Sequence, residues 1–342
     1  MDIEGRSLSS PLNSINGKKI LVQGRKVLRE QFSKNANSTA LLRGHCRLVD
    51  IVLRQAWKEM AFPGSITLLA VGGYGRGYLF PNSDIDLVVL LPAKENKQDA
   101  MDAVTKSKLE SWVRLLWDME LEVGHSVRTL TECTEESEKD ITVQTSLLEA
   151  RRLAGSSKLF SMFLQVMKSG LNPREFFNAK QFEQQQRHGR YHEVTNNLEP
   201  NLKESPGGLR DLQNILWVSR ATGYGRSWSD LAKGGLITKE EARLTKRHEK
   251  ILQGLRIRLH YLAERREDRL LFDFQALLAK EYKITDKSPR LAGELLMQRY
   301  YRAAKSVTQI NTIFLLTLRT EIFPYANVTP VILNKYFQKR GE

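Results

Sequence analysis

Cysteine is scarce in this sequence, and long hydrophobic runs are absent from it. Cys46 and Cys133 are the only two cysteines among 342 residues, which excludes a disulfide framework, and their spacing matches no metal-binding motif. No apolar stretch approaches the roughly 20 residues needed to cross a bilayer, so we expect no membrane partner. The N-terminus lacks the apolar core of an export signal, and we therefore expect a cytoplasmic protein.

Two common phosphate-binding motifs are also missing. The glycine cluster at 72–77 is not followed by the Gly-Lys-Ser/Thr ending of a P-loop. It is not a clean G-x-G-x-x-G with an acidic residue ending the next strand, which disfavours a dinucleotide-binding fold. Internal repeats and low-complexity tracts are absent as well, so a repeat architecture is not expected.

The composition is that of an ordinary globular protein with an excess of basic residues. Hydrophobic residues make up 41% and charged residues 27% of the chain, whose length allows two domains. The formal net charge of +14 would favour nucleic acid, anionic nucleotides or acidic protein partners. Acidic residues are interleaved with the basic ones, as in 265–269, so a solvated helix surface is the default interpretation and nucleic acid is not the expected partner.

A glycine-rich turn followed by two acidic residues is the most informative pattern. The apolar run 66–71 stops at Gly72 and Gly73. After ten intervening residues, Asp84 and Asp86 open the next apolar run. Because strand side chains alternate, we expect both carboxylates on one face, while the apolar residues around them point into the core. This combination predicts a nucleotidyltransferase active site.

The two carboxylates predict a metal site. Carboxylates on one face repel each other unless a cation lies between them, and Mg²⁺ prefers carboxylate oxygens together with the phosphates of a nucleotide. Gly72 and Gly73 would let the backbone approach those phosphates, and Arg76 can add charge-assisted contacts. We therefore predict Asp84 and Asp86 as catalytic metal ligands.

A third carboxylate is expected close to these two. Apolar residues alternate along the predicted strand 121–130, and if they face the core, Glu122 lies on the same open side as Asp84 and Asp86. Asp140 is the rival candidate, although it is also suited to cap a helix that begins directly after it. Both carboxylates stay open as candidates at this point.

The remaining pattern divides the chain into a mixed part and a helical part. We expect a loose lead-in at 1–17, a nucleotidyltransferase domain with N-terminal helices at 18–140, a helical domain at 141–325 and a linker at 326–342. No convincing strand follows residue 140. Helical periodicity is predicted at 141–154, 156–169, 174–192, 208–221, 228–233, 238–270, 272–281 and 288–319.

The loop 196–211 interrupts this helical part. Two prolines and the pair Gly207 and Gly208 indicate a structured connection that opens the next helix. Because a helix N-terminus offers unpaired N–H groups, a second anion-binding point is physically reasonable there, with Lys203 and Arg210 assisting it. A helix connection whose polar residues satisfy their own backbone explains the same residues equally well.

Several of these segments resemble the bacterial PII-protein uridylyltransferase family, also called uridylyl-removing enzymes. The resemblance extends from about residue 20 to the C-terminus and is carried by 71–86, 121–129, 197–211, 269–273 and 300–302. It implies an α+β fold, with a small mixed-sheet, polymerase-beta-like nucleotidyltransferase domain followed by an all-α helical bundle domain. The reaction it implies is Mg²⁺-dependent transfer of UMP from UTP to a tyrosine of the nitrogen-regulatory PII protein.

The resemblance also implies roles for residues of both parts. Asp84 and Asp86 would hold the metals, beside Glu122 as the candidate third carboxylate. The expected nucleotide-binding residues are Gly72, Gly73, Arg76, Ser83, Lys203, Gly207, Gly208 and Arg210.

The chain departs from the family in one respect. Full-length members continue into a histidine-aspartate phosphohydrolase domain that removes UMP and into two ACT domains that sense glutamine, whereas this sequence contains no His-Asp dipeptide. We therefore expect transferase chemistry without UMP removal or direct glutamine sensing. Two alternatives remain: a nucleotidyltransferase that acts on RNA or a small molecule, motivated by the basic charge, and a catalytically silent nucleotide-binding regulatory module.

Overall fold

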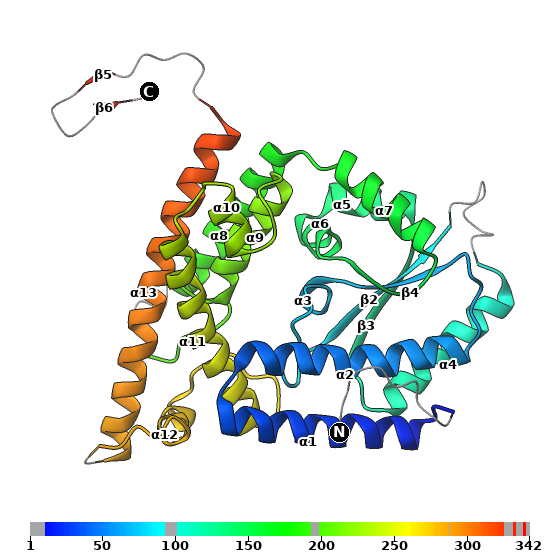
Figure 1. Cartoon of the computed structure of the whole chain (residues 1–342), viewed down its shortest axis with the longest axis horizontal. Coiled ribbons are helices and arrows are strands. Elements are labelled where there is room, and N and C mark those ends of the chain that lie inside the picture. Colours follow the sequence, from blue (N-terminus) through cyan, green and yellow to red (C-terminus); the bar gives the residue numbers. More distant parts are fainter. Residues whose placement is uncertain are drawn as a thin grey trace. The chain divides into compact units, whose positions relative to one another are not determined.

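The sheet-containing part of the chain consists of a small sheet with helices packed on it, as Figure 1 shows. The structure is a computed structural model, and it describes residues 11–92, 101–192, 198–286, 288–324, 331–332 and 338–339. The α-helices are α1 (Ser14–Asn35), α2 (Ser38–Glu59), α3 (Gly72–Gly75), α4 (Ala103–Asp118), α5 (Leu130–Lys139), α6 (Ile141–Leu148), α7 (Ser157–Ser169), α8 (Pro173–His192), α9 (Leu209–Ala221), α10 (Trp228–Lys233), α11 (Lys239–Ala263), α12 (Phe272–Glu281) and α13 (Pro289–Ile322). The strands are β1 (Thr67–Ala70), β2 (Ile85–Leu91), β3 (Val123–Thr129), β4 (Arg151–Gly155), β5 (Val331–Ile332) and β6 (Gln338–Lys339).

The main sheet is mixed and has four strands in the order β3-β2-β1-β4. β1 pairs antiparallel with both β2 and β4, whereas β2 and β3 run parallel. A short β5–β6 pair forms a separate two-stranded sheet. The predicted α+β fold, with a small mixed sheet and a helical part, is confirmed.

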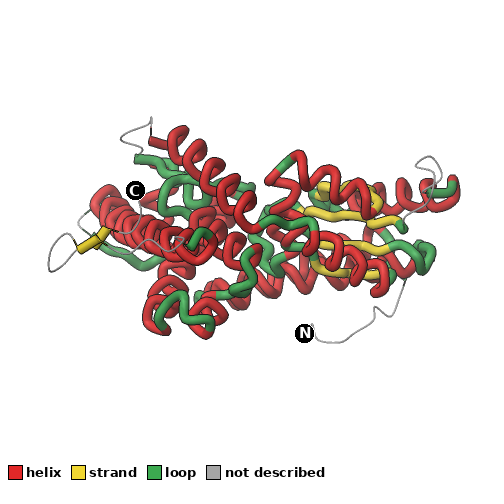
Figure 2. Tube along the Cα trace, turned by 90° about the horizontal axis from the view of Figure 1, so that it is seen from above, coloured by secondary structure: helices red, strands yellow, loops and turns green. Residues whose placement is uncertain are grey.

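Helices cover the main sheet on both faces, as Figure 2 shows from above. On one face the side chains of α5, α6 and α7 pack with those of β1 and β2 in a single buried cluster. Its members include Leu69, Val88, Cys133, Leu147 and Phe163. On the other side α2 packs against β4, and Arg54 Nε of α2 donates to the carbonyl of Leu153 at 3.1 Å. The strands of the main sheet are therefore held by helices packed on each side.

The N-terminal helices begin where their caps are satisfied. Asn13 accepts from the N–H of Asn16 and its own N–H is bound by the Asn16 side chain, so α1 begins at Ser14, four residues before the predicted start. Asn37 caps α2 in the same manner through Ala40. Of the predicted lead-in at 1–17, residues 1–10 lie outside the described residues, as does most of the predicted linker at 326–342.

The chain divides into two compact units that interrupt one another in sequence. The first contains Met1–Leu171 and Gln253–Gly293, and the second contains Asn172–Leu252 and Glu294–Glu342. The division thus falls at Leu171 and not at the predicted residue 140, since α5, α6, β4 and α7 all pack on or pair with the sheet.

Two predictions about the helical half are wrong. The predicted helix 141–154 ends at Leu148, and Arg151–Gly155 forms β4 at the edge of the sheet, although no strand was expected after residue 140. The segment is extended because β1 supplies its hydrogen-bonding partner. The predicted helix 238–270 stops at Ala263, because Glu264 adopts a left-handed backbone with φ of 54°.

Among its described residues, the second unit contains α-helices, their connections and the short β5–β6 pair. α8 packs along α9, and the Trp228 ring of α10 lies 6.3 Å from that of Phe314 on α13. Gly207, with φ of +77°, lies where an added Cβ would come within 2.2 Å of the Ala304 carbonyl oxygen, so only glycine fits beside α13 there. Within the described part of the chain, no helix has the length and apolar character to span a membrane.

Candidate active site

The glycine turn lies between β1 and β2. Gly72 has φ of +55°, and a Cβ added to it would lie 3.2 Å from Asp86 Oδ2 and 3.3 Å from Ser146 Oγ. At Gly75 the added Cβ would lie only 2.4 Å from the Glu149 carbonyl oxygen. The turn therefore needs glycine at these two positions, which lets its backbone lie directly beside the Asp86 carboxylate.

Asp84 and Asp86 stand at the start of β2, as predicted. Ile85, Leu87 and Val89 are buried with 1–2% of their surface exposed, whereas the Asp84 side chain is 47% exposed. Asp86 is half-buried and its backbone carbonyl accepts from the N–H of Val71 at 3.0 Å. Alternation thus keeps the apolar neighbours in the core and leaves the two carboxylates on the accessible face.

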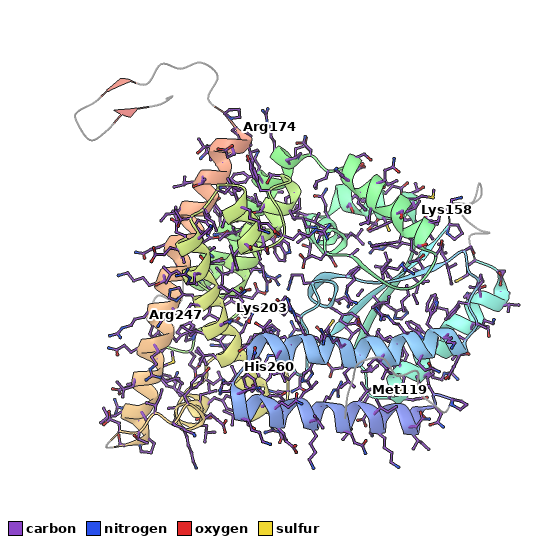
Figure 3. The ribbon with its side chains drawn as sticks, in the orientation of Figure 1. Met119, Lys158, Arg174, Lys203, Arg247 and His260 are labelled. Atoms are coloured by element: carbon purple, nitrogen blue, oxygen red, sulfur yellow. The ribbon has the colours of Figure 1, made fainter. Side chains whose placement is uncertain are left out.

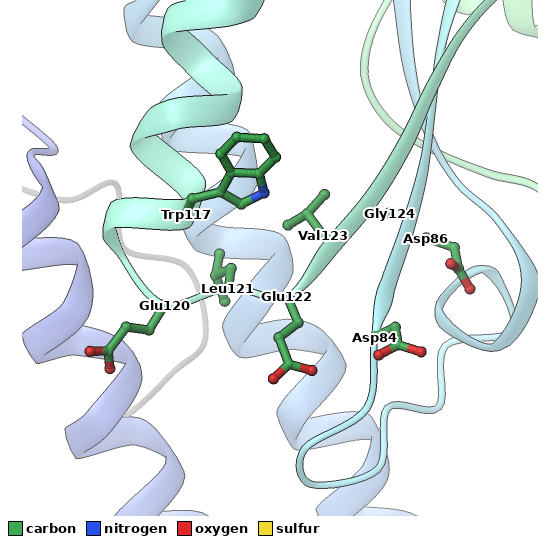
Figure 4. Close-up of a pocket in the computed structure, with 8 residues that line it drawn as sticks. All are labelled: Asp84, Asp86, Trp117, Glu120, Leu121, Glu122, Val123 and Gly124. Carbon is green, nitrogen blue, oxygen red and sulfur yellow. The ribbon is translucent and has the colours of Figure 1, made fainter. Parts of the chain in front are cut away.

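Glu122 joins these carboxylates in one cavity. The parallel register pairs Asp86 with Gly124, and the N–H of Ile85 donates to the Glu122 carbonyl at 2.9 Å. Asp84, Asp86 and Glu122 line an open cavity of about 650 Å³, with the remaining walls formed by Trp117, Glu120, Leu121, Val123 and Gly124. Figure 4 shows the three carboxylates around this cavity.

The rival Asp140 has another position. Its side chain accepts from the N–H of Thr142 at 2.6 Å and caps α6, and it is not among the residues that line the cavity. The structure therefore brings Glu122, rather than Asp140, beside the two aspartates. Its catalytic role remains a prediction.

The donor set fits a hard divalent cation that takes ligands from its substrate. Across the described residues, no three His, Cys, Asp or Glu side chains are grouped so as to hold a metal ion. Asp84 and Asp86 offer carboxylate oxygens at an open cavity, and Mg²⁺ commonly uses one or two carboxylates with water and phosphate oxygens as the other ligands. Asp84 and Asp86 therefore suit Mg²⁺, and Glu122 shares their cavity without completing a three-ligand group.

Arg76 is held close to the turn by an ion pair. Its Nη1 donates to Glu149 Oε2 at 2.7 Å, and the Glu149 side chain is only 6% exposed. The guanidinium thus ties the turn to the residues between α6 and β4. Contacts of Arg76, Gly72, Gly73 and Ser83 with a triphosphate remain predictions.

Behind the turn lies a buried polar cluster that the sequence did not indicate. Tyr74 donates its hydroxyl to Asp50 Oδ1 at 2.5 Å, and Arg151 donates to both Asp50 oxygens at 2.6 and 3.0 Å. Burial, together with the adjacent Asp50, raises the pKa of Tyr74 well above its usual value, so the hydroxyl keeps its proton. The cluster ties the glycine turn to α2 and β4.

A second missed residue is Arg266, whose guanidinium contacts the Asp84 carboxylate. Arg266 follows α11 in the part of the chain that returns to the first unit. The signal available in sequence is the run of charged residues at 265–269, for which a solvated helix surface is the default interpretation. Nothing local in that run indicates a partner 182 positions earlier.

The predicted nucleotide residues of the loop 196–211 belong to the second unit, and the loop is strongly cross-linked. Arg210 pairs with Glu204 at 2.9 Å and lies over the Trp217 ring, while Lys203 Nζ lies 3.4 Å from Glu204 Oε1. Residues 196–197 of this loop lie outside the described residues.

The N–H groups at the N-terminus of α9 are bonded within the same segment. The N–H of Gly207 donates to Asp211 Oδ2 at 2.7 Å, and that of Gly208 donates to the Ser205 carbonyl at 2.8 Å. The next three N–H groups are bound to carbonyls of the same segment. Of the two interpretations left open for this loop, these bonds fit the helix connection whose residues satisfy their own backbone, and anion binding there stays a prediction.

Asp211 holds this loop together from the inside. It is fully buried and accepts from Arg187 at 2.6 Å, with His188 Nε2 at 2.9 Å. Burial alone would raise the pKa of Asp211, but the contacts with His188 and Arg187 bring it below its usual value. Asp211 thus stabilises the loop, and the nucleotide roles of Lys203, Gly207, Gly208 and Arg210 remain predictions.

Comparison with known proteins identifies both parts of the chain. A family model described as GlnD PII-uridylyltransferase matches residues 175–315, and a nucleotidyltransferase domain model matches residues 53–147. The second match contains the glycine turn and both aspartates.

Curated relatives match nearly the whole chain. It is 62% identical over 94% of its length to the bifunctional uridylyltransferase/uridylyl-removing enzyme of Nitrosospira multiformis. Identity to the enzymes of the same name from Burkholderia orbicola and Aromatoleum aromaticum is 46% over 91% and 47% over 93% of this chain. In each case the matched region covers 36% of the relative, so the chain spans about a third of their length.

Proposed function

Because this chain belongs to the bacterial PII-uridylyltransferase family, we propose that it transfers UMP from UTP to a tyrosine of the nitrogen-regulatory PII protein. The observation that carries the proposal is the cavity in which Asp84, Asp86 and Glu122 meet beside the glycine turn. A cytoplasmic location follows from the proposed substrates. The names of the relatives support the uridylyl group as the group transferred, and the description of the matching family model supports PII protein as the acceptor.

We assign the metal-binding role to Asp84 and Asp86. Bound there, Mg²⁺ would neutralise charge on the phosphates and on the departing pyrophosphate. Gly72 lets the backbone lie beside Asp86, and Gly73 adds no side chain next to it, which leaves space for a triphosphate close to the carboxylates. Arg76 and Ser83 border the same turn and strand, and we assign them to the nucleotide.

Glu122 is assigned as the proton acceptor. In the proposed reaction the tyrosine oxygen forms a bond to the α-phosphorus, the bond from that phosphorus to the bridging oxygen breaks, and pyrophosphate leaves. The hydroxyl proton of the tyrosine passes to the Glu122 carboxylate, whose exposed side chain borders the cavity. Glu122 is not assigned to the metal, because Asp84 and Asp86 already supply the two carboxylates proposed as its ligands.

Only the transferase half of the relatives' name is proposed for this chain. The sequence contains no His-Asp dipeptide, the pair expected of the UMP-removing phosphohydrolase domain. We therefore expect that these 342 residues do not release UMP from modified PII protein. Incubation of uridylylated PII protein with the chain, followed by intact-mass measurement, checks this directly.

Replacement of both metal ligands tests the proposal. Asp84→Asn with Asp86→Asn removes two negative charges from the cavity but keeps side-chain size, so transfer of label from UTP to PII protein should fall to background. Asp118→Asn is the matched control, because Asp118 is exposed at the end of α4 and does not line the cavity.

The acceptor and the nucleotide are tested in the same assay. Labelled UTP and labelled ATP are each offered with PII protein and with RNA, since the net charge of +14 favours an anionic acceptor as the alternative. Labelling of RNA with PII protein unlabelled would replace the proposed function by the alternative one. A double mutant as active as the parent chain would remove both aspartates from the mechanism.

A further inference from the structure

Arg266 and Asp84 form an exposed ion pair at the edge of the candidate active site. The guanidinium of Arg266 contacts Asp84 Oδ2, and the two side chains are 46% and 47% exposed. Both residues belong to the first unit, although 182 positions separate them in the sequence. Asp84 is one of the two carboxylates assigned to the metal, so the arginine competes directly for a ligand oxygen.

Buried neighbours fix the loop that carries Arg266. Asp268, two residues later, accepts from Arg256 at 2.5 and 3.2 Å, and His260 Nε2 lies 3.1 Å from its Oδ1. Although burial alone would raise the pKa of Asp268, the contacts with His260 and Arg256 bring it well below its usual value. Asp268 therefore stays ionised at neutral pH and anchors the loop.

The same groups fix the segment that leads into Asp84. His260, labelled in Figure 3, places its Nδ1 against the Pro81 carbonyl, and Asn82 Nδ2 donates to the His260 carbonyl at 3.3 Å. The Arg256 guanidinium lies 4.1 Å from the centre of the Phe80 ring. The segment 80–84 and the loop 264–269 are thus attached to the same buried residues, which holds Arg266 within reach of the cavity.

The pair of Arg266 and Asp84 is itself weak enough to exchange. An ion pair between two half-exposed side chains contributes little to folding, since water screens it and both side chains lose freedom. A guanidinium binds phosphate oxygens through two parallel hydrogen bonds, which favours a triphosphate over one exposed carboxylate oxygen. The loop is stabilised instead by the contacts of Asp268 with Arg256 and His260, whose side chains are largely shielded from water.

We propose that Arg266 is a nucleotide-positioning residue that exchanges its partner during binding. It neutralises Asp84 when no nucleotide is bound, and it transfers to the triphosphate when a divalent cation takes the Asp84 carboxylate. The inference rests on the proposed function, because it requires that Asp84 binds a cation and that the cavity binds a nucleotide triphosphate.

Two binding measurements on Arg266→Ala test the exchange without relying on activity. Binding of Mn²⁺ without nucleotide, followed by electron paramagnetic resonance, should become about two- to fivefold tighter, because the competing guanidinium is gone. Binding of a UTP analogue with a methylene α–β bridge in the presence of Mn²⁺ should become about tenfold weaker or more, because charge-assisted hydrogen bonds are lost. Arg266→Lys keeps the charge, so its affinities for Mn²⁺ and for the analogue should lie between those of the parent chain and those of Arg266→Ala.

Arg265→Ala is the matched control. Its guanidinium is 67% exposed and pairs with Glu267 at 3.0 Å, away from Asp84, so both affinities should equal those of the parent chain. An unchanged Mn²⁺ affinity or an unchanged analogue affinity in Arg266→Ala would overturn the exchange while the proposed function stands. Failure of the parent chain to bind Mn²⁺ with the analogue would instead overturn the proposed function, and this inference with it.

Discussion

Glu122 and Glu120 line the same cavity, but their contacts differ. Glu120 pairs with Lys18 of α1, whereas Glu122 follows the strand register onto the side of Asp84 and Asp86. Glu120 therefore serves as the control for Glu122: both carboxylates line the cavity, but only Glu122 is assigned to the proposed proton transfer.

Glu122→Gln should reduce transfer at saturating UTP about 10²- to 10⁴-fold, the range expected when a general base is removed. Binding of the UTP analogue with Mn²⁺ should change little, because Glu122 is not assigned to the metal. Initial rates of UMP incorporation into PII protein measure the first effect and calorimetry the second. Glu120→Gln should retain the parent rate, and a fully active Glu122→Gln beside an inactive Asp140→Asn would return the role to Asp140.

Residue-scale prediction succeeded where the signal was local. The alternation of carboxylate and apolar residues in 84–89 lies within a single strand segment. The structure buries the apolar residues there, as expected. Arg266 was not predictable in this manner. Its role depends on a contact that folding creates between segments 182 positions apart, and its charged surroundings look like any solvated helix end.

At the scale of elements, the glycine turn contains one glycine that packing requires and another that leaves space for a ligand. An added Cβ at Gly75 would meet the carbonyl oxygens of Glu149 and Ala70 at 2.4 and 2.9 Å, and these backbone atoms cannot move without disturbing the sheet. At Gly73 the nearest atom is Arg76 Nη2 at 3.6 Å, an ordinary contact distance. Two glycines of the same turn therefore meet different physical requirements: Gly75 is needed for steric reasons, whereas Gly73 has space around it.

Gly75→Ala should destabilise the chain by about 1–3 kcal/mol, the usual cost of overpacking a tight site. Gly73→Ala should leave the melting temperature close to that of the parent chain but weaken binding of the UTP analogue, because its methyl group occupies space assigned to the triphosphate. Thermal unfolding and calorimetry of the two variants check the difference. Equal melting temperatures for both would contradict the steric argument at Gly75.

Elements with their own periodicity were predicted well, and elements defined by a partner were not. The alternating segment 121–130 became β3 and the stripe at 156–169 became α7. β4 was missed because 151–155 is a short edge strand with two arginines, and its extended form depends on pairing with β1. The end of α11 was missed because the charged residues after Ala263 have no helix-breaking glycine or proline.

At the scale of the whole molecule, the return of the chain into the first unit was the least predictable feature. Gln253–Gly293 rejoins the sheet-containing unit after an excursion of 81 residues through the second one. Periodicity along one helix, such as α11, cannot reveal that its last turns belong to a different compact unit from its first turns. Contacts between single side chains hold the returning segment in the first unit, and His45 makes one of these contacts.

His45 of α2 connects this returning segment to the N-terminal helices. Its Nε2 lies 3.3 Å from the Tyr261 hydroxyl, and only 4% of the residue is exposed. Burial, with a smaller contribution from Arg25, lowers the pKa of His45 to about 4 from an unperturbed value of 6.5. The folded first unit therefore holds this imidazole neutral at a pH where the unfolded chain is already protonated.

The sign of the resulting pH dependence follows from proton counting. Between pH 6.5 and 4 the unfolded chain binds a proton at His45 that the folded chain does not, so stability falls as the pH is lowered through this window. The full loss is of the order of 3 kcal/mol and levels off below pH 4, where the folded chain also becomes protonated. Asp268 and Asp211, whose pKa values are lowered, lose their contribution mainly below this window.

His45→Gln should flatten the fall in unfolding free energy between pH 6.5 and 4, because glutamine does not titrate there. Tyr261→Phe is the control: it removes the hydroxyl contact but leaves His45 buried, so the fall should persist from a lower starting stability. Urea unfolding at pH 7, 6, 5 and 4, followed by tryptophan fluorescence, measures both. A parent-like pH profile in His45→Gln would show that protonation elsewhere controls the acid sensitivity, and that burial of this imidazole is not what couples the returning segment to pH.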